Sequence, residues 1–256
     1  MSTNSPITLV QLSDLHFSGE KPLKNHPKLP AEGLANVLKH IETTIPEEKI
    51  IILTGDLVAD PDPALYQELA SIFRTLPHTV AAIPGNHDSF EMMKEHFFGY
   101  NISSKTVLSI GKWLNILLDS SHSGLVKHSG RIINSDLEML ENTLTQHPNQ
   151  HILIFLHHPP IAFGSEKFKK IILENAADFN SIVQRFEQVK AVIFGHAHTE
   201  FSLLRQKILY LSCPSTWAQF DRSQDDLFFM PTPSAYNSYR LYDDGSFLFM
   251  THYCWS

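Results

Sequence analysis

The stretch ITLVQLSDLH, residues 7–16, passes directly from a short apolar run into two side chains that can bind a metal ion. Four further apolar runs follow the same plan, and each is followed by a residue with a metal-binding atom. These runs cover residues 50–53, 79–83, 152–156 and 191–194. Short apolar runs rich in β-branched residues are typical of strands covered on both faces. The pattern predicts one parallel sheet with polar residues at the carboxyl ends of its strands.

Segments with helical periodicity separate these strands. Apolar residues recur at spacings of three and four over residues 34–45, 65–73 and 137–144. A proline follows each segment and ends the helix before the next strand begins. Alternating strands and helices indicate right-handed βαβ crossovers, whose ligands gather outside the carboxyl ends of the strands.

The pattern changes after about residue 201. Four runs, 201–204, 207–212, 238–242 and 246–251, are typical of strands, and Asp243-Asp244-Gly245 predicts a hairpin turn between the last two. We expect residues 201–256 to complete a second, largely antiparallel sheet packed on the first. The chain has 256 residues and is 43% hydrophobic, which suits a single domain over residues 1–256.

Composition excludes several classes of protein. The net charge is -7, and no block of basic residues is longer than Lys169-Lys170, so we expect no nucleic-acid polymer as a partner. Two cysteines, Cys213 and Cys254, are too few for a disulfide framework. The N-terminus lacks a basic region typical of a signal peptide, and nowhere do 18 apolar residues run together. These features predict a soluble, cytoplasmic protein without a membrane segment.

Seven potential metal ligands occupy the five strand ends: Asp14, His16, Asp56, Asn86, His157, His196 and His198. In Asp14-Leu15-His16 and His196-Ala197-His198, alternate residues of an extended chain would face one way and reach one ion. One carboxylate such as Asp56 has two oxygens and can bridge two cations. Each motif alone has a plain structural alternative, such as a turn or a helix cap. Five motifs after five consecutive strands instead indicate a single two-metal site.

The charge of such a site suits a phosphodiester. Two divalent ions supply +4, Asp14 and Asp56 remove 2 and a bridging hydroxide removes 1, which leaves about +1 for a substrate of charge -1. Metal coordination lowers the pKa of water from 15.7 to roughly 7, so no Ser or Cys nucleophile is needed. The predicted mechanism is in-line attack by a dimetal-bridging hydroxide, with Asn86 neutralising charge on the phosphoryl oxygens.

His87 is the predicted general acid, which protonates the departing alkoxide. The neighbouring Asp88 has two interpretations. It is either the carboxylate that orients His87 or a cap on the helix that follows. The predicted catalytic residues are therefore His87 and Asp88, and Asn86 and His87 are expected to contact the substrate.

With its residues in this order the chain resembles the calcineurin-like metallophosphoesterases, whose signature runs D-x-H, G-D, G-N-H-[DE], H and G-H-x-H. The match extends from Asp14 to His198. The resemblance implies a four-layer αββα sandwich of two mixed β-sheets flanked by helices. It also implies His157, rather than His158, as the ligand at its strand end. It assigns one metal to Asp14, His16, Asp56 and His198, and the other to Asp56, Asn86, His157 and His196. The implied ions are two divalent or mixed-valence Fe, Mn, Zn or Co ions.

Two stretches are similar to the bacterial class III 3',5'-cyclic nucleotide phosphodiesterases. They are CPSTWAQF, residues 213–220, and Leu118-Asp119-Ser120 followed by Gly130. The resemblance implies a small-molecule phosphodiester, above all 3',5'-cyclic AMP, as the substrate. Two alternatives stay open: a broader phosphoesterase for glycerophosphodiesters, 2',3'-cyclic nucleotides or nucleotide monoesters, and a non-catalytic metal-binding scaffold.

Several aromatic and histidine residues near the expected site have more than one interpretation. Trp217 or Phe220 would stack on a nucleobase, or else pack in the core or in a homodimer interface. The apolar run Leu227–Met230 suits a lid, a dimer contact or core. His26 and His122 fall in loops expected to border the cleft.

Overall fold

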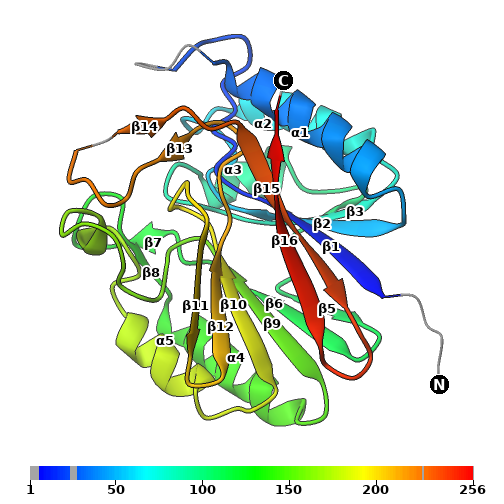
Figure 1. Cartoon of the computed structure of the whole chain (residues 1–256), viewed down its shortest axis with the longest axis vertical. Coiled ribbons are helices and arrows are strands. Elements are labelled where there is room, and N and C mark those ends of the chain that lie inside the picture. The colour runs from blue at the N-terminus through cyan, green and yellow to red at the C-terminus, as the bar shows by residue number, and fades with distance from the viewer. Residues whose placement is uncertain (1–5, 24–27, 227, 256) are drawn as a thin grey trace.

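The computed structural model describes residues 6–23, 28–226 and 228–255. Two six-stranded mixed sheets pack face to face, and helices cover the outer face of each (Figure 1). This arrangement confirms the predicted α/β class and the four-layer αββα sandwich. Within the described residues, no helix combines the length and apolar character that a bilayer crossing needs.

The first sheet has the strand order β16-β15-β1-β2-β3-β4. Neighbours from β1 to β4 are parallel, whereas β15 pairs antiparallel with both β1 and β16. The strands are β1 (Ile7–Leu12), β2 (Lys49–Thr54), β3 (Thr79–Ile83), β4 (Ile102–Ser103), β15 (Ser234–Leu241) and β16 (Phe247–Cys254). Its helices are α1 (Pro30–Thr44), α2 (Pro63–Arg74) and α3 (Phe90–His96).

The second sheet has the order β11-β12-β10-β9-β6-β5. Its strands are β5 (Val107–Ile110), β6 (Trp113–Leu117), β9 (His151–Leu156), β10 (Val189–Phe194), β11 (Phe201–Arg205) and β12 (Ile208–Ser212). Helices α4 (Asn134–Gln146) and α5 (Ala176–Val183) cover it, and a short 3-10 helix, η1 (Phe168–Lys170), precedes α5. Two small ribbons pair β7 (His122–Ser123) with β8 (Gly130–Arg131) and β13 (Gln219–Phe220) with β14 (Phe229–Met230).

The expectation of one parallel sheet for the five ligand-bearing strands was wrong. Strands β1, β2 and β3 belong to the first sheet, and β9 and β10 belong to the second. The chain passes from the first sheet to the second after β4, and β6 of the second sheet pairs parallel with β9. Its sequence WLNIL is interrupted by a polar residue, Asn115, whose side chain donates to the carbonyl of Leu108 on β5. Because of this polar residue, the apolar pattern of the sequence does not predict β6, although the strand is fully buried.

Residues 201–256 do not all complete the second sheet. Strands β11 and β12 join it as expected, whereas β15 and β16 extend the first sheet. The reason lies in β15, which is buried on both faces. Tyr239 packs between the two sheets, and Tyr236 packs under the helices of the first sheet. A strand with apolar side chains on both faces needs a covered position, and the open edge of β1 provides one.

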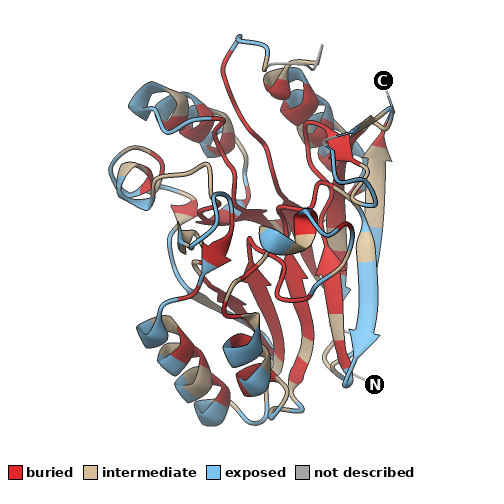
Figure 2. Ribbon diagram, turned by 90° about the vertical axis from the view of Figure 1, so that its left-hand side faces the viewer, coloured by how far each residue is buried: buried red, intermediate tan, exposed pale blue. Residues whose placement is uncertain are grey.

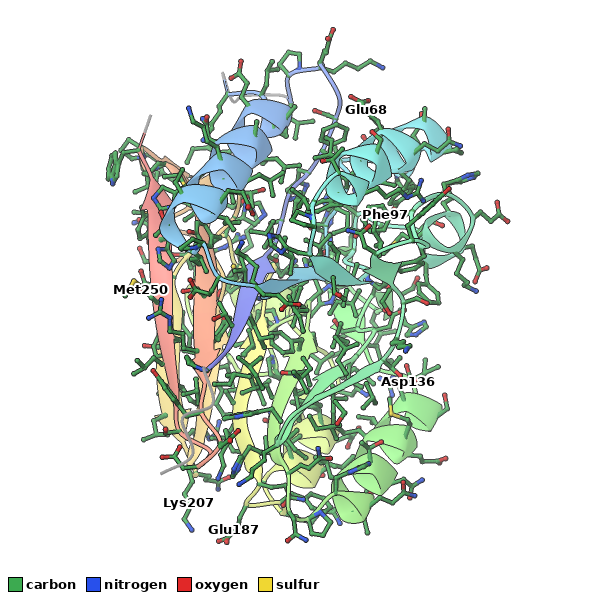
Figure 3. All side chains as sticks on the ribbon, turned by 90° about the vertical axis from the view of Figure 1, so that its right-hand side faces the viewer. Glu68, Phe97, Asp136, Glu187, Lys207 and Met250 are labelled. Carbon is green, nitrogen blue, oxygen red and sulfur yellow. The ribbon has the colours of Figure 1, made fainter. Side chains whose placement is uncertain are left out.

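Three apolar cores hold the four layers together. One lies between the first sheet and α1–α3, one between the sheets, and one between the second sheet and α4–α5. The central strands of both sheets are buried along most of their length, whereas the helices expose their outer faces and the edge strands β11 and β16 expose much of their length (Figure 2). Figure 3 illustrates the contrast, with the buried Phe97 under α2 and the exposed Met250 on β16.

Truncation in the middle core is expected to destabilise the protein strongly. Phe155 on β9 is fully buried between the sheets, so Phe155→Ala should lower the free energy of unfolding by about 3–5 kcal/mol. The matched control is Leu204→Ala on β11, a side chain 69% exposed, with an expected change within about 0.5 kcal/mol. Urea unfolding followed by circular dichroism measures both. Equal stability losses in the two variants would contradict this assignment of the core.

Candidate metal centre

The five predicted ligand clusters meet at one edge of the sandwich, although they come from two sheets. Backbone hydrogen bonds join the loops that follow the strands. Asp14 N–H donates to the carbonyl of Gly55 (3.0 Å), which joins the loops after β1 and β2. Gly195 N–H donates to the carbonyl of His157 (3.1 Å), which joins the loops after β9 and β10. The strand ends of both sheets form a single site, because His196 N–H in the loop after β10 donates to Asp14 Oδ2 in the loop after β1 (3.0 Å).

The ligands reach this site through a left-handed backbone. Five of the seven have positive φ angles: 52° at Asp14, 45° at His16, 51° at Asp56, 63° at His196 and 49° at His198. Non-glycine residues rarely adopt this conformation, and such strain clusters at functional sites. The expectation that Asp14/His16 and His196/His198 converge by extended-chain alternation was therefore wrong. They converge because the chain turns sharply at each of these residues.

The first group of ligands contains Asp14, His16, Asp56 and His198. The Nε2 atoms of His16 and His198 lie 3.1 Å apart, and His198 Nε2 lies 3.2 Å from Asp14 Oδ1. His16 Nε2 is 3.6 Å from Asp56 Oδ2. All four residues are buried. The donor atoms of Asp14, His16 and His198 are close enough together to hold one metal ion, and Asp56 approaches this group through His16.

The second group contains Asp56, Asn86, His157 and His196. His157 Nε2 lies 3.4 Å from Asp56 Oδ1 and 3.2 Å from Asn86 Oδ1. Asp56 therefore presents one carboxylate oxygen to each group. His196 is buried, and its Nε2 atom has no hydrogen-bond partner among the described residues. An unpaired imidazole nitrogen at this place suits a metal ligand, because burial of an unpaired polar atom is otherwise costly.

Hydrogen bonds to the atoms that point away from the site fix the orientation of the candidate ligands His157, His198 and Asn86. His157 Nδ1 lies 2.7 Å from the carbonyl of Thr54, and His198 Nδ1 lies 2.8 Å from that of Ala218. Each Nδ1 must donate to a carbonyl, which leaves the Nε2 lone pair directed at the site. Asn86 Nδ2 donates to His128 Nδ1 (3.2 Å), so the amide oxygen of Asn86 faces His157.

The protonation of the site favours cations. Burial alone would raise the pKa of Asp56, yet the adjacent His157 imidazole holds this pKa well below its usual value. Burial lowers the pKa of His16 to about 3, so its ring is neutral. Burial also lowers the pKa of His157, but Asp56 outweighs this effect and raises it to about 9. A cation on Nε2 would replace this proton. Ionised carboxylates, imidazole nitrogens and an amide oxygen together suit Zn, Mn, Fe or Co.

His87 lies beside the two groups and is held from two directions. Its backbone N–H donates to Asp56 Oδ1 (2.8 Å), and its Nδ1 lies 2.7 Å from the carbonyl of Ala59. The His87 ring also stacks on His128, with centroids 5.5 Å apart. Because His87 Nδ1–H donates its hydrogen bond to the Ala59 carbonyl, the Nε2 atom remains available for proton transfer.

Asp88 takes neither of the two roles considered for it. The group that orients His87 is the carbonyl of Ala59, and the helix cap of α3 is Ser89, whose side chain accepts from Met92 N–H. Asp88 instead joins the loops after β2 and β3. Its half-buried carboxylate accepts hydrogen bonds from Leu57 N–H (3.0 Å), Gly85 N–H (2.9 Å) and Tyr66 Oη (3.0 Å).

The segment CPSTWAQF, residues 213–220, bonds to the loop after β1 and forms one wall of the site. Ser215 Oγ donates to the carbonyl of Asp14 (2.7 Å), and Gln219 bonds to the backbone of Ser215. The ring of Trp217 lies 5.4 Å from that of His16, and Phe220 lies 4.5 Å from His198. These two aromatic residues pack with Ala218, Leu23 and Phe229 in a small apolar cluster.

The apolar run Leu227–Met230 belongs in part to the same wall. Phe229 and Met230 form β14, which pairs with β13, and the Phe229 ring packs on Phe220 at 4.9 Å. Phe228 is 58% exposed, and Leu227 lies outside the described residues. Phe229 therefore extends the aromatic wall over the site.

A cavity of about 390 Å³ opens onto the ligands. His16, Asp56, Asn86, His87, His196 and His198 line it, together with Trp217, Phe220 and Phe229. Among the lining residues that the sequence interpretation did not identify are His128 and Arg222. The loop that contains His122 borders the cavity as expected, but the residue of this loop that lines the cavity is His128, whereas His122 pairs with Asp119 (3.7 Å). His26 lies outside the described residues.

The fold and the site together define a metallophosphoesterase, in which loops at one edge of an αββα sandwich present Asp, His and Asn ligands. The model of the calcineurin-like phosphoesterase family matches residues 7–200. The chain belongs to this family and is a hydrolase that acts on phosphoric ester bonds.

Curated relatives match almost the whole chain. The 3',5'-cyclic-nucleotide phosphodiesterase of Nostoc sp. is 30% identical over 246 residues, which are 96% of this chain and 92% of the relative. The 3',5'-cyclic adenosine monophosphate phosphodiesterase CpdA of Escherichia coli K12 is 30% identical over 251 residues, 96% of this chain and 89% of the relative. The CpdA protein of Pseudomonas aeruginosa is 28% identical over 244 residues, 95% and 89% of the two chains.

Solved structures share the fold at lower identity. A dimetal phosphatase from Danio rerio superposes with a TM-score of 0.67 at 15% identity and covers 94% of both chains. The GAP50 protein of Plasmodium superposes with a TM-score of 0.66 at 14% identity, over 98% of this chain and 89% of that one. These likenesses show the four-layer architecture.

Proposed function

We propose that this protein hydrolyses 3',5'-cyclic AMP at a two-metal centre, with His87 as the general acid. The observation that carries the proposal is the position of Asp56, whose two carboxylate oxygens face two separate groups of ligands. Relatives named as cyclic nucleotide phosphodiesterases, at about 30% identity over nearly the full chain, support the choice of substrate.

Each metal ion has its own set of ligands in this proposal. Asp14, His16, Asp56 and His198 would hold one ion, and Asp56, Asn86, His157 and His196 the other. When bound, two such ions lower the pKa of a coordinated water and neutralise charge on the phosphoryl oxygens. The residues then fix the geometry. The carbonyls of Thr54 and Ala218 hold His157 and His198 in place, and His128 turns the oxygen of Asn86 inward.

His87 is well placed to protonate the leaving oxygen. Hydrolysis of a cyclic diester expels an alkoxide, which is a poor leaving group without a proton. His87 lines the cavity, and the Ala59 carbonyl fixes its ring so that Nε2 faces away from that contact. Stacking on His128 further limits rotation of the ring. The proton donor is thus fixed before the substrate binds.

The cavity suits a small nucleotide. Its volume of about 390 Å³ lies in the range of roughly 300–1,000 Å³ that is usual for small-molecule sites. The polar ligands lie next to an aromatic wall of Trp217, Phe220 and Phe229, which would contact the nucleobase. Phe220 and Phe229 have purely apolar side chains, and the indole N–H of Trp217 donates to the carbonyl of Lys28 (3.0 Å). Aromatic stacking of this kind accepts any base, which favours a broader phosphoesterase as the second candidate.

A panel of esters distinguishes the two candidates. Protein reconstituted with Mn²⁺, Fe²⁺, Zn²⁺ or Co²⁺ is assayed with 3',5'-cyclic AMP, 2',3'-cyclic AMP, a glycerophosphodiester and a nucleotide monoester. We expect the highest kcat/KM for 3',5'-cyclic AMP. Fast cleavage of another ester without turnover of 3',5'-cyclic AMP would favour the broader enzyme. A metal-loaded protein that cleaves none of them would indicate a non-catalytic scaffold.

A further inference from the structure

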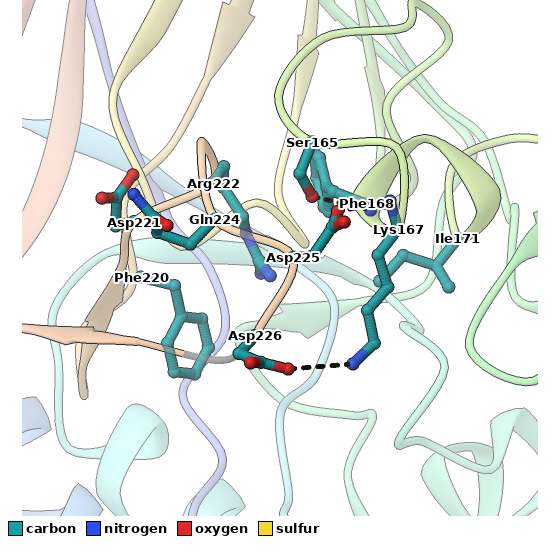
Figure 4. A pocket seen from close by; sticks show the side chains of 10 residues that line it. All are labelled: Ser165, Lys167, Phe168, Ile171, Phe220, Asp221, Arg222, Gln224, Asp225 and Asp226. Carbon is teal, nitrogen blue, oxygen red and sulfur yellow. Dashed lines mark hydrogen bonds and ion pairs between the residues drawn. The ribbon is translucent and has the colours of Figure 1, made fainter.

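Arg222 stands out in the wall of the metal-site cavity. Among the described residues that line this cavity, it is the one lysine or arginine. It follows β13 in a loop that faces the segment around η1. In Figure 4, Arg222 and Phe220 come from the first of these segments, and Lys167, Phe168 and Ile171 come from the second. The cation therefore lies where the loop after β13 meets the cavity.

The guanidinium group of Arg222 is firmly held. It lies between two aromatic rings, with its Cζ atom 4.4 Å from the centroid of Phe168 and 4.8 Å from that of Phe220. Its Nε donates to the carbonyl of Ala197, and its Nη2 donates to the carbonyl of His196 (2.9 Å). A guanidinium has five N–H donors, so three remain after these two bonds. Arg222 is thus a pre-oriented cation with unused donors.

Nearby carboxylates are occupied by other partners. Asp221 accepts from Ser223 N–H (2.9 Å), and Asp225 accepts from the backbone N–H of Lys167 (3.1 Å). Asp226 pairs with Lys167 Nζ at 4.0 Å, at the exposed rim drawn in Figure 4. Within the described part of the chain, no ion pair involves Arg222. The carboxylate whose charge acts on Arg222 is that of Asp14, a candidate metal ligand, and it forms no salt bridge with Arg222 among the described residues. A half-buried cation without a salt bridge is stabilised when an anion binds to it.

We propose that Arg222 binds phosphoryl oxygens of the substrate through the free N–H groups of its guanidinium. This inference rests on the proposed function, because it assigns the anion at the same site. Arg222 contacts the loop after β10, in the second sheet, whereas His87 follows β3, in the first sheet. The two residues thus have separate tasks: Arg222 holds the anion, and His87 protonates the leaving oxygen. The planar fork of arginine matches a pair of phosphate oxygens better than lysine does.

Arg222 also supports the backbone of His196 and Ala197, so the test must separate anion binding from loop support. The probe is inorganic phosphate, titrated into protein saturated with Mn²⁺ and followed by isothermal calorimetry. Bound metal is counted in parallel. The variants are Arg222→Gln and Arg222→Lys, and the matched control is Lys167→Gln. Lys167 is a neighbouring cation whose side chain is 68% exposed.

We expect Arg222→Gln to bind phosphate about 10- to 100-fold more weakly at full metal occupancy, since charge-assisted hydrogen bonds are lost. Arg222→Lys should recover part of this affinity, because it keeps the charge and loses the fork. Lys167→Gln should change the affinity by less than about twofold, as its charge is screened by solvent.

Wild-type phosphate affinity in metal-saturated Arg222→Gln would overturn the inference. If that variant also needed more Mn²⁺ for saturation, the role of Arg222 would be confined to supporting the loop. Phosphate binding does not depend on which ester is cleaved. A protein that fails to hydrolyse 3',5'-cyclic AMP but binds phosphate through Arg222 would refute the proposed substrate and leave this inference intact.

Discussion

Replacement of His87 by alanine is expected to lower kcat for 3',5'-cyclic AMP by about 10²- to 10⁴-fold, the usual contribution of a positioned general acid. The substitution removes the imidazole but leaves the backbone N–H of residue 87, which donates to Asp56 Oδ1 (2.8 Å). Asp56 therefore keeps this contact, and metal content should stay unchanged. Steady-state kinetics and metal analysis of the same preparation measure both quantities.

The leaving group provides the control for His87→Ala. A nitrophenyl ester expels an anion that needs little protonation, so its hydrolysis should fall far less than that of the cyclic nucleotide. Equal losses with both substrates would point to a damaged site rather than to a missing acid. Parent-level turnover of 3',5'-cyclic AMP by the variant would show that His87 does not donate the proton.

Asp56→Asn is the second change with a large expected effect. The Asp56 carboxylate lies 3.6 Å from His16 Nε2 in one ligand group and 3.4 Å from His157 Nε2 in the other. An asparagine keeps the shape but offers a single neutral oxygen, which cannot serve two cations equally. We expect fewer than two bound ions per chain. Activity should fall on the order of 10³-fold or more, above the 10- to 100-fold typical of groups that only orient a ligand.

A matched control for Asp56 lies in the same cavity. Asp60 also lines it, but its side chain is exposed and belongs to none of the candidate ligand groups. Asp60→Asn should therefore retain its metal, as measured by elemental analysis of protein after gel filtration. Two tightly bound ions in Asp56→Asn, or activity within tenfold of the parent, would refute the bridging role.

Much of the secondary structure could be predicted because it depends on local patterns. Strand Thr79–Ile83 has the predicted bounds, and the helix predicted over 65–73 is found at Pro63–Arg74. Its start follows from chemistry that the sequence shows, since the Asp62 side chain accepts from Ala64 N–H (2.7 Å). The division into two sheets could not be predicted in this way, because strand pairing depends on partners far away in the chain.

The candidate site likewise has features that the sequence predicts and features that it does not. The seven candidate ligands could be predicted from the sequence because a metal ion demands particular donor atoms, and those donors recur after apolar strands. Residues that act through a neighbour are different. His128 accepts a hydrogen bond from the amide of Asn86, and Ser215 donates one to the carbonyl of Asp14. Arg222 lines the cavity from a loop that is distant in the sequence. No spacing in the sequence relates these residues to the ligands they support.

The sequence by itself therefore determined the class of fold through local periodicity. It also predicted the metal-binding side chains and the general acid, from the donor atoms that metal ions prefer and from the proton that an alkoxide leaving group needs. Only the tertiary structure decided how the ligands converge. It showed that β1–β3 and β9–β10 lie in different sheets, that left-handed turns aim the side chains, and that Ala59 rather than Asp88 orients His87. The physical reason is that these contacts join segments distant in sequence, and only the packing of two sheets brings them together.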